Sequence, residues 1–259
     1  MDQDRPWLAS EHAAREHVQS NRIEIRSRPA DEFAELLCAL VDSGYSTAIE
    51  TLGSGCSISV AESERLQEVL ALTISNGNVE LLSSLLAIGI SPDARFGDMH
   101  LLTYASAVSS TDCALHLIEH GADPDAADAD GSTPLLWATQ EDAVEIVDAL
   151  IRVGCILSPV DGDGDTPAWK AAGEGNARLL SKFLDLGIDP DSRHTHPSWN
   201  GYTLLMFAAL YNHYPVIELL LHRGADANYI ADDGKDALAV AKEYAEDEVV
   251  DLLIVHKRP

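Results

Sequence analysis

The sequence has little positive charge. Its 259 residues include 17 Lys and Arg against 43 Asp and Glu, so the formal net charge is −26 at pH 7. A surface of this kind repels the phosphates of nucleic acids and the heads of anionic lipids, and it attracts cations and basic proteins. We therefore expect no nucleic-acid partner, and a basic protein partner is favoured.

Cysteines and long apolar runs are also scarce. The four cysteines (Cys38, Cys56, Cys113 and Cys155) are widely spaced and include no Cys-x-x-Cys pair. We interpret them as reduced thiols of a cytosolic protein, two of them buried. No run approaches the ~20 apolar residues that a membrane helix needs. The N-terminus lacks the apolar region of a secretory signal, so we expect a cytoplasmic protein without a membrane partner.

The common motifs of catalytic and metal sites are missing as well. There is no Gly-x-Ser-x-Gly, His-Glu-x-x-His, phosphate-loop or Gly-x-Gly-x-x-Gly pattern. The run DGDGDT from Asp161 invites comparison with a calcium loop, but Thr166 and Ala172 stand where that loop needs Gly and Glu. We expect its Asp side chains to bond their own backbone. His194 and His196 are expected to lie on the surface of an inserted loop without binding a metal. No cofactor is expected.

The sequence does contain a repeated block. Glycines that end its apolar helical stretches recur at intervals of 32, 33, 33 and 37 residues, at Gly89, Gly121, Gly154, Gly187 and Gly224. Each such Gly can adopt the left-handed conformation that ends a helix. An Asp-rich turn follows, and then a capping Thr with Pro in the first helical turn, as at Thr133 and Thr166. A second helix carries paired apolar positions that one block cannot bury alone, so neighbouring blocks are expected to stack.

These blocks resemble ankyrin repeats. The marks are DGSTPLLWAT from Asp130, DGDGDTPAWKAA from Asp161, NGYTLLMFAA from Asn200 and the recurrent GADPD or GIDPD. The resemblance covers about 61–259 and implies that each unit is a β-hairpin finger followed by two antiparallel helices. The expected fold is all-α with short β-hairpin fingers, an α-solenoid of six to seven units with degenerate N- and C-terminal capping repeats.

The expected organisation is an N-terminal arm, 1–30, followed by one domain, 31–259. In the arm we expect a helix from Ser10 to Gln19 and then an extended chain. The expected units are 31–60, 61–94, 95–127, 128–160, 161–193, 194–230 and 231–259. The family's His after Thr-Pro-Leu usually ties each finger to its neighbour. It is replaced here by Leu136, Trp169 and Met206, which predicts less rigid fingers.

The resemblance implies that partners bind the fingers and the exposed side of the first helix. The residues expected there are Asp130, Ser132, Gln140, Glu141, Asp163, Asp165, Glu174, Trp199, Asn200, Tyr202, Tyr211, Asp233 and Lys235. This surface is acidic in the middle and aromatic toward its C-terminal side. Trp199, Tyr202 and Tyr211 are expected to point outward together, as the aromatic residues of interface hot spots do. Trp137 and Trp169 are expected to lie partly in the core.

We therefore expect a non-catalytic, monomeric binding module that engages a basic protein. In its sharpest form this is an inhibitor or immunity protein that blocks a cationic toxin or nuclease. The alternative is a general scaffold or adaptor, including a host-directed effector, that uses residues 1–30 as a second contact. A third hypothesis, an enzyme with its site near Cys56, lacks the positioned base that a nucleophile needs.

Overall fold

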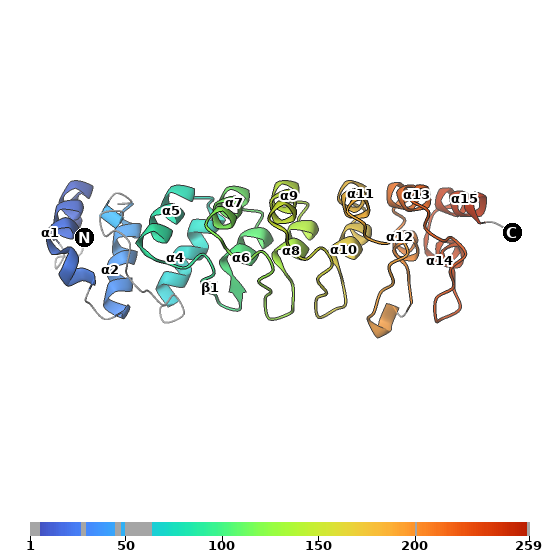
Figure 1. Cartoon of the computed structure of the whole chain (residues 1–259), viewed down its shortest axis with the longest axis horizontal. Helices are drawn as coiled ribbons and strands as arrows, with labels where there is room; N and C mark the ends of the chain where they lie inside the picture. The colour runs from blue at the N-terminus through green and yellow to red at the C-terminus, as the bar shows by residue number, and fades with distance from the viewer. Residues whose placement is uncertain (1–5, 27–29, 45–47, 50–63, 200, 258–259) are drawn as a thin grey trace. The chain divides into compact units, whose positions relative to one another are not determined.

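The computed structural model describes residues 6–26, 30–44, 48–49, 64–199 and 201–257 (Figure 1). Contacts divide the chain into two compact units, 1–129 and 130–259. Both units consist mainly of helices, and the described residues contain a single sheet, of two strands. The predicted all-α class is confirmed. That residues 31–259 form one domain stays a prediction.

The first unit holds one short 3-10 helix, η1, six α-helices and a β-hairpin among its described residues. The helices are η1 (Pro6–Ala9), α1 (Glu11–Arg26), α2 (Ala30–Asp42), α4 (Glu64–Ser75), α5 (Val79–Ile88), α6 (Leu101–Ala107) and α7 (Thr111–Glu119). Strands β1 (Arg95–Phe96) and β2 (Met99–His100) pair antiparallel, with Arg95 opposite His100. This hairpin leads directly into α6, which is the predicted order of finger and first helix.

The N-terminal segment differs from the expected extended arm. Helix α1 continues to Arg26, with non-helical backbone angles only at Asn21 (φ −112, ψ 15). Ala14, Val18 and Ile25 are fully buried. Their spacing of four and seven residues places them on one face of a helix, so this segment packs against the first unit instead of extending from it. The prediction of extended chain after Gln19 is therefore wrong for residues 20–26.

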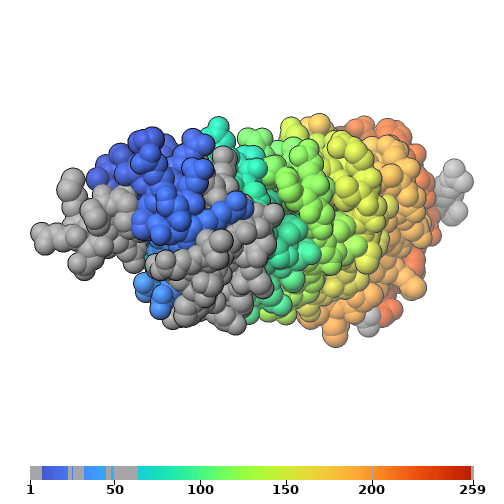
Figure 2. All heavy atoms as spheres, turned by 60° about the vertical axis from the view of Figure 1, so that its left-hand side comes forward, coloured from blue at the N-terminus to red at the C-terminus, as the bar shows by residue number. Residues whose placement is uncertain are grey.

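The second unit contains four helix pairs and one short 3-10 helix among its described residues. The helices are α8 (Pro134–Gln140), α9 (Val144–Val153), α10 (Pro167–Gly173), α11 (Ala177–Asp185), η3 (Pro197–Trp199), α12 (Leu204–Leu210), α13 (Tyr214–His222), α14 (Ala237–Tyr244) and α15 (Asp247–His256). The first helices of the pairs, α8, α10, α12 and α14, contact one another in chain order, and α11, α13 and α15 form a second row (Figure 1). In Figure 2 the atoms of this unit accordingly fall into successive bands from yellow to red.

The predicted caps begin the first helices of this unit. Thr133, Thr166 and Thr203 each accept a hydrogen bond through the side-chain oxygen from the backbone N–H three residues ahead, at 3.5, 3.4 and 3.4 Å. Pro134 and Pro167 occupy the first turn, where the missing N–H costs nothing. Both predicted threonine caps are confirmed.

The paired apolar positions of the second helices contribute to the core of the second unit. The fully buried members are Ile146, Val147, Leu150, Leu179, Leu180, Phe183, Val216, Ile217 and Leu220. Burying one such side chain stabilises the fold by about 1.5–3 kcal/mol relative to exposure. Helices α9, α11 and α13 each end where the chain turns through a left-handed glycine, at Gly154 (φ 87), Gly187 (φ 96) and Gly224 (φ 88).

The three described cysteines, Cys38, Cys113 and Cys155, are free thiols and are buried. Burial raises the pKa of the Cys38 thiol to about 11, which keeps this thiol protonated and unreactive. The interpretation as buried reduced thiols is confirmed for them, and Cys56 lies outside the described residues. None of the described helices is long and apolar enough to cross a membrane.

From α4–α5 to α12–α13, the turn between the two helices of a repeat contains a left-handed residue. Three turns place a residue other than glycine there: Ser109 (φ 54), Asp142 (φ 51) and Asn212 (φ 61). Asp142 and Asn212 accept hydrogen bonds through their side chains from the following repeat, at 2.6 and 3.0 Å. Ser109 is exposed, and it adopts the left-handed backbone conformation, which is strained for a residue with a Cβ atom.

We predict that Ser109→Gly stabilises the protein by about 0.5–1 kcal/mol, because glycine takes a positive φ without steric cost and this gain exceeds its entropic cost. Urea unfolding of the whole chain measures the change. Asp142→Gly is the matched control and is expected to gain less, because it loses the hydrogen bond from Asn176. A Ser109→Gly variant no more stable than the parent would contradict the prediction.

Candidate functional site

The finger loop 161–166 is held together by its own aspartates. The Asp161 carboxylate accepts hydrogen bonds from the backbone N–H groups of Asp163 (3.1 Å) and Asp165 (2.8 Å). The expectation that these side chains bond their own backbone is confirmed for Asp161, whereas the Asp165 carboxylate bonds Lys170 and His194 instead. In the described part of the chain, no group of three or more His, Cys, Asp or Glu side chains is arranged to hold a metal ion.

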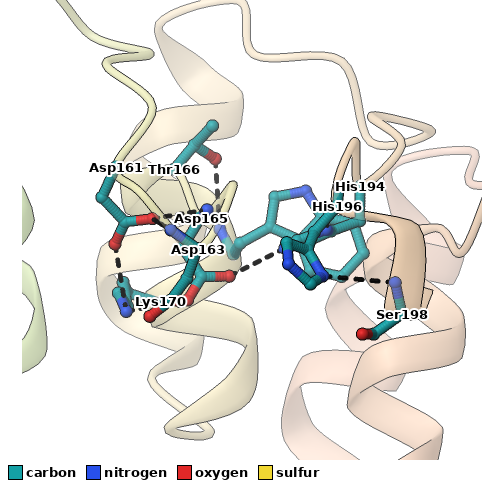
Figure 3. A network of polar contacts seen from close by, with 9 residues as sticks. Asp161, Asp163, Asp165, Thr166, Lys170, His194, His196 and Ser198 are labelled. Atoms are coloured by element: carbon teal, nitrogen blue, oxygen red, sulfur yellow. Dashed lines mark hydrogen bonds and ion pairs between the residues drawn. The ribbon is translucent and has the colours of Figure 1, made fainter. Parts of the chain in front are cut away.

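Lys170 joins this finger to the helix that follows it (Figure 3). Its amine lies 2.7 Å from an Asp165 oxygen and 3.4 Å from an Asp161 oxygen. Burial lowers the pKa of Lys170, but the hydrogen bonds and charges of Asp165 and Asp161 outweigh it, so the pKa lies above its ordinary value. Lys170 therefore stays charged and offsets part of the negative charge of the finger. Sequence reasoning missed it, although it is the first basic residue after the acidic run.

His194 is buried and does not decorate the inserted loop, so that expectation is wrong. It is 4% exposed, and its Nε2 lies 2.9 Å from the second Asp165 oxygen (Figure 3). Its ring meets the Trp169 ring edge-on, with centroids 4.6 Å apart. Its Nδ1 accepts a hydrogen bond from the backbone N–H of His196, which is half-buried. His194 thus ties the finger of one repeat to the finger of the previous repeat.

Other groups connect the remaining fingers of the second unit. The backbone N–H of Gly162 donates to the Asp130 carbonyl at 2.7 Å, and the Tyr202 hydroxyl donates to the Asp233 carboxylate at 3.0 Å. Together with His194, these bonds link each finger of the unit to its neighbour. The fingers were expected to be less rigid because the family's usual His is replaced. Bonds made by Gly162, His194 and Tyr202, at other positions of the repeat, connect them instead.

A hollow of about 480 Å³ opens between the first two fingers of this unit, and we call it the finger hollow. It is lined by Asp130, Ser132, Trp137, Gln140, Asp161, Gly162, Asp163 and Lys170. Four of the predicted partner-binding residues therefore lie together: Asp130, Ser132, Gln140 and Asp163. Three carboxylates and one ammonium line this hollow, so its local charge is negative.

A second hollow of about 300 Å³ lies at the C-terminal ends of α8, α10 and α12, and we call it the helix-end hollow. It is lined by Gln140, Asp165, Trp169, Lys170, Gly173, Glu174, Phe207 and Tyr211. Gln140 and Lys170 line both hollows, which are therefore adjacent. Of the predicted residues, Gln140, Asp165, Glu174 and Tyr211 belong to this second hollow.

Aromatic rings form the wall of the helix-end hollow. Phe207 packs edge-on against Trp169 (centroids 4.9 Å apart), Tyr211 (4.9 Å) and Trp199 (5.5 Å). Tyr211 is 48% exposed and Trp199 is half-buried. Trp169 is fully buried and Trp137 half-buried, which confirms that both lie partly in the core. Sequence reasoning missed Phe207, although its place directly before the paired alanines of "LMFAA" puts it on the helix that Tyr211 caps.

Tyr202 does not point outward, so that part of the predicted aromatic cluster is wrong. It is 9% exposed. Burial raises its pKa, and the hydrogen bond that its hydroxyl donates to Asp233 adds to this effect. Its ring still contacts Trp199, with centroids 5.8 Å apart, but its burial leaves little surface for a partner.

The other predicted residues that the structure describes lie outside both hollows. Glu141 is exposed at the C-terminus of α8, next to Gln140. Lys235 donates to Glu243 at 2.6 Å, and its amine lies 5.7 Å from the centroid of the Tyr244 ring. Asn200 lies outside the described residues. The structure thus gathers seven of the thirteen predicted positions around two adjacent hollows of the second unit.

Known proteins provide an independent comparison. The chain is 29% identical over 170 residues to SH3 and multiple ankyrin repeat domains protein 2 of Homo sapiens, covering 53% of this chain and 9% of that protein. It is 28% identical over 159 residues to potassium channel AKT2/3 of Arabidopsis thaliana, covering 61% and 19%. It is 32% identical over 101 residues to NF-kappa-B inhibitor alpha of Sus scrofa, covering 37% and 31%. The chain therefore spans between 9% and 31% of the length of these relatives.

The family comparison covers most of the described repeats. Residues 102–194, 153–231 and 169–258 match the model of the family described as ankyrin repeats (3 copies). These matches together span more than half of the chain, and they coincide with the capped helix pairs and finger loops of the structure. The chain belongs to the ankyrin repeat family, whose repeats are protein–protein interaction modules.

Proposed function

We propose that this chain is a cytoplasmic, monomeric, non-catalytic module that binds a basic protein through the finger hollow and the helix-end hollow. The negative net charge favours a more specific version of this proposal, in which the chain is an inhibitor or immunity protein that blocks a cationic toxin or nuclease. The observation that carries the proposal is the pair of adjacent hollows lined by carboxylates, with Lys170 as the one base among their lining residues.

Charge and burial would have separate roles in this binding. The net charge of −26 would accelerate encounter with a cationic protein, and the carboxylates of the hollows would direct it to the fingers. Asp130, Asp163 and Glu174 are exposed at the mouths of these hollows. Tyr211 would supply the apolar area that a stable interface buries at its centre.

Two considerations support the inhibitor form. A surface of closely spaced carboxylates presents negative charge as nucleic acid does, so it could occupy the substrate groove of a cationic nuclease. One relative, NF-kappa-B inhibitor alpha, is by its name the inhibitor of another protein. In this chain the corresponding role would require no catalytic group.

The alternative function is that of a scaffold or adaptor, and the relatives favour it in one respect. The chain matches only 9% of the human SH3 and multiple ankyrin repeat protein, a protein whose name records a further domain type. An adaptor would use α1 as a second contact. Because α1 carries buried residues such as Val18, deleting it would also disturb the first unit, whereas Arg15→Glu changes only an exposed position. Loss of a partner in that variant would favour the adaptor.

The salt dependence of binding to a nona-lysine peptide tests the proposed function. We predict measurable binding that weakens about tenfold or more between about 0.05 and 0.5 M salt, because exposed charges are screened beyond about a Debye length. Isothermal titration calorimetry measures the affinity, and a nona-glutamate peptide is the control that should not bind. Absence of binding at low salt, or an affinity independent of salt, would contradict the proposal.

A further inference from the structure

One position recurs at the end of each first helix in the second unit. Glu141, Glu174 and Tyr211 are the C-terminal caps of α8, α10 and α12, and Tyr244 is the last residue of α14. The intervals between them are 33, 37 and 33 residues, which is the repeat spacing. Two neighbouring members of this series, Glu174 and Tyr211, line the helix-end hollow.

The last repeat shows what this position can hold. The amine of Lys235 lies 5.7 Å from the centroid of the Tyr244 ring and donates to Glu243 at 2.6 Å. The Tyr244 hydroxyl donates to the other oxygen of Glu243 at 2.8 Å. The Lys235 ammonium therefore contacts both the tyrosine ring and a carboxylate, which is the arrangement of a cation–π contact supported by an ion pair.

The preceding repeat has the same tyrosine without a base of its own. Tyr202 stands one residue before the helix cap, where the last repeat has Lys235, and its hydroxyl is bonded to Asp233. Across the described residues, no lysine or arginine side chain lies over the Tyr211 ring and no ion pair involves Glu174. Lys170, the base that lines the hollow, is held by Asp161 and Asp165.

The ring of Tyr211 is fixed in place before any partner arrives. Phe207 packs edge-on against it, and His213 stacks on it with centroids 6.2 Å apart. The His213 ring is itself bonded through Nε2 to the Gly173 carbonyl, at 2.7 Å. A Cβ at Gly173 would lie 2.8 Å from the Phe207 ring, so the missing side chain leaves room for this packing. A fixed wall of this kind reduces the ordering cost of binding.

We propose that the helix-end hollow receives an arginine side chain of the basic protein partner, with its guanidinium against the Tyr211 ring and bonded to Glu174. This inference rests on the proposed function and specifies the group that is recognised. The hollow carries two carboxylates and one paired ammonium, Asp165, Glu174 and Lys170, so a single cation complements its charge.

Arginine suits this hollow better than lysine does. The guanidinium is planar, stacks on aromatic faces, and presents a fork of N–H donors that matches a carboxylate. It is also more weakly hydrated than an ammonium, so less is lost when it leaves water for an aromatic wall. A lysine would gain the charge contact with Glu174 and little of the stacking on Tyr211.

A comparison of nona-arginine with nona-lysine tests this inference, because the two peptides carry the same charge. We expect nona-arginine to bind about five- to tenfold more tightly, measured by calorimetry at one salt concentration. Tyr211→Ala should remove most of this preference and change the affinity for nona-lysine by less than about twofold. Glu174→Gln should also reduce the preference. Circular dichroism verifies that each variant is folded.

Matched variants separate the hollow from the rest of the surface. Tyr244→Ala removes the same side chain at the equivalent position of the next repeat, and Glu218→Gln removes one exposed carboxylate from α13. Both should retain the preference for arginine. Equal affinity of the parent chain for the two peptides, or a preference that survives Tyr211→Ala, would overturn this inference alone. Failure of both peptides to bind would overturn the proposed function and the inference together.

Discussion

Replacing Trp169 with alanine is expected to lower the free energy of unfolding by about 3–5 kcal/mol. The side chain is only 1% exposed and contacts the rings of His194 and Phe207, at centroid distances of 4.6 and 4.9 Å. Truncation would leave a cavity between two repeats and remove the wall against which His194 meets Asp165. Because each repeat is stabilised by its neighbours, the loss should weaken the docking of the adjacent repeat as well.

Trp137→Ala is the matched control for this prediction. Trp137 belongs to the previous repeat and is half-buried, so its truncation should cost about 1–2 kcal/mol. Guanidinium unfolding followed by far-ultraviolet circular dichroism measures both variants, and the slope with denaturant shows whether the repeats still unfold together. Equal costs for the two variants would show that Trp169 is no more important to the core than Trp137.

Local features of the repeats could be predicted from the sequence. The threonine caps, the left-handed glycines and the paired apolar positions depend on residues a few places apart, and their physical requirements are visible in any single block. The finger loop at Asp161 was predictable for the same reason, since its carboxylate bonds backbone groups two and four residues ahead.

Contacts between repeats could not be predicted in the same way. Asp165 meets His194 across 29 residues, and Tyr202 meets Asp233 across 31. Which side chains meet depends on the geometry of stacking, and no pattern within one block specifies it. The sequence pattern therefore predicted exposed side chains for His194 and Tyr202. In the structure both are buried and form hydrogen bonds with residues of neighbouring fingers.

The N-terminal helix illustrates a different failure. Residues 1–30 hold equal numbers of arginines and acids, a composition that favours an exposed arm over a packed helix. Ala14, Val18 and Ile25 follow the spacing of one helix face and are buried. Hydrophobic periodicity was the better indicator of structure here, because burial of an apolar face decides whether a short helix forms.

The second large effect is expected from neutralising the finger surface. The triple variant Asp130→Asn, Asp163→Asn and Glu174→Gln should weaken binding of nona-lysine about tenfold. Each exposed carboxylate contributes about 0.2–1 kcal/mol to such contacts. The amides keep the size of the side chains, and asparagine is favoured in turns of this kind, so the fingers should keep their shape.

The measurement that most directly tests binding through the two hollows compares this variant with an equally charged control. The control is Glu145→Gln, Glu218→Gln and Asp251→Asn, which neutralises three exposed carboxylates on helices α9, α13 and α15, the second helices of their pairs. At one salt concentration, calorimetry should show about tenfold weaker binding for the finger variant and less than about twofold for the control. Equal weakening of the two variants would show that binding follows net charge alone and would contradict the account.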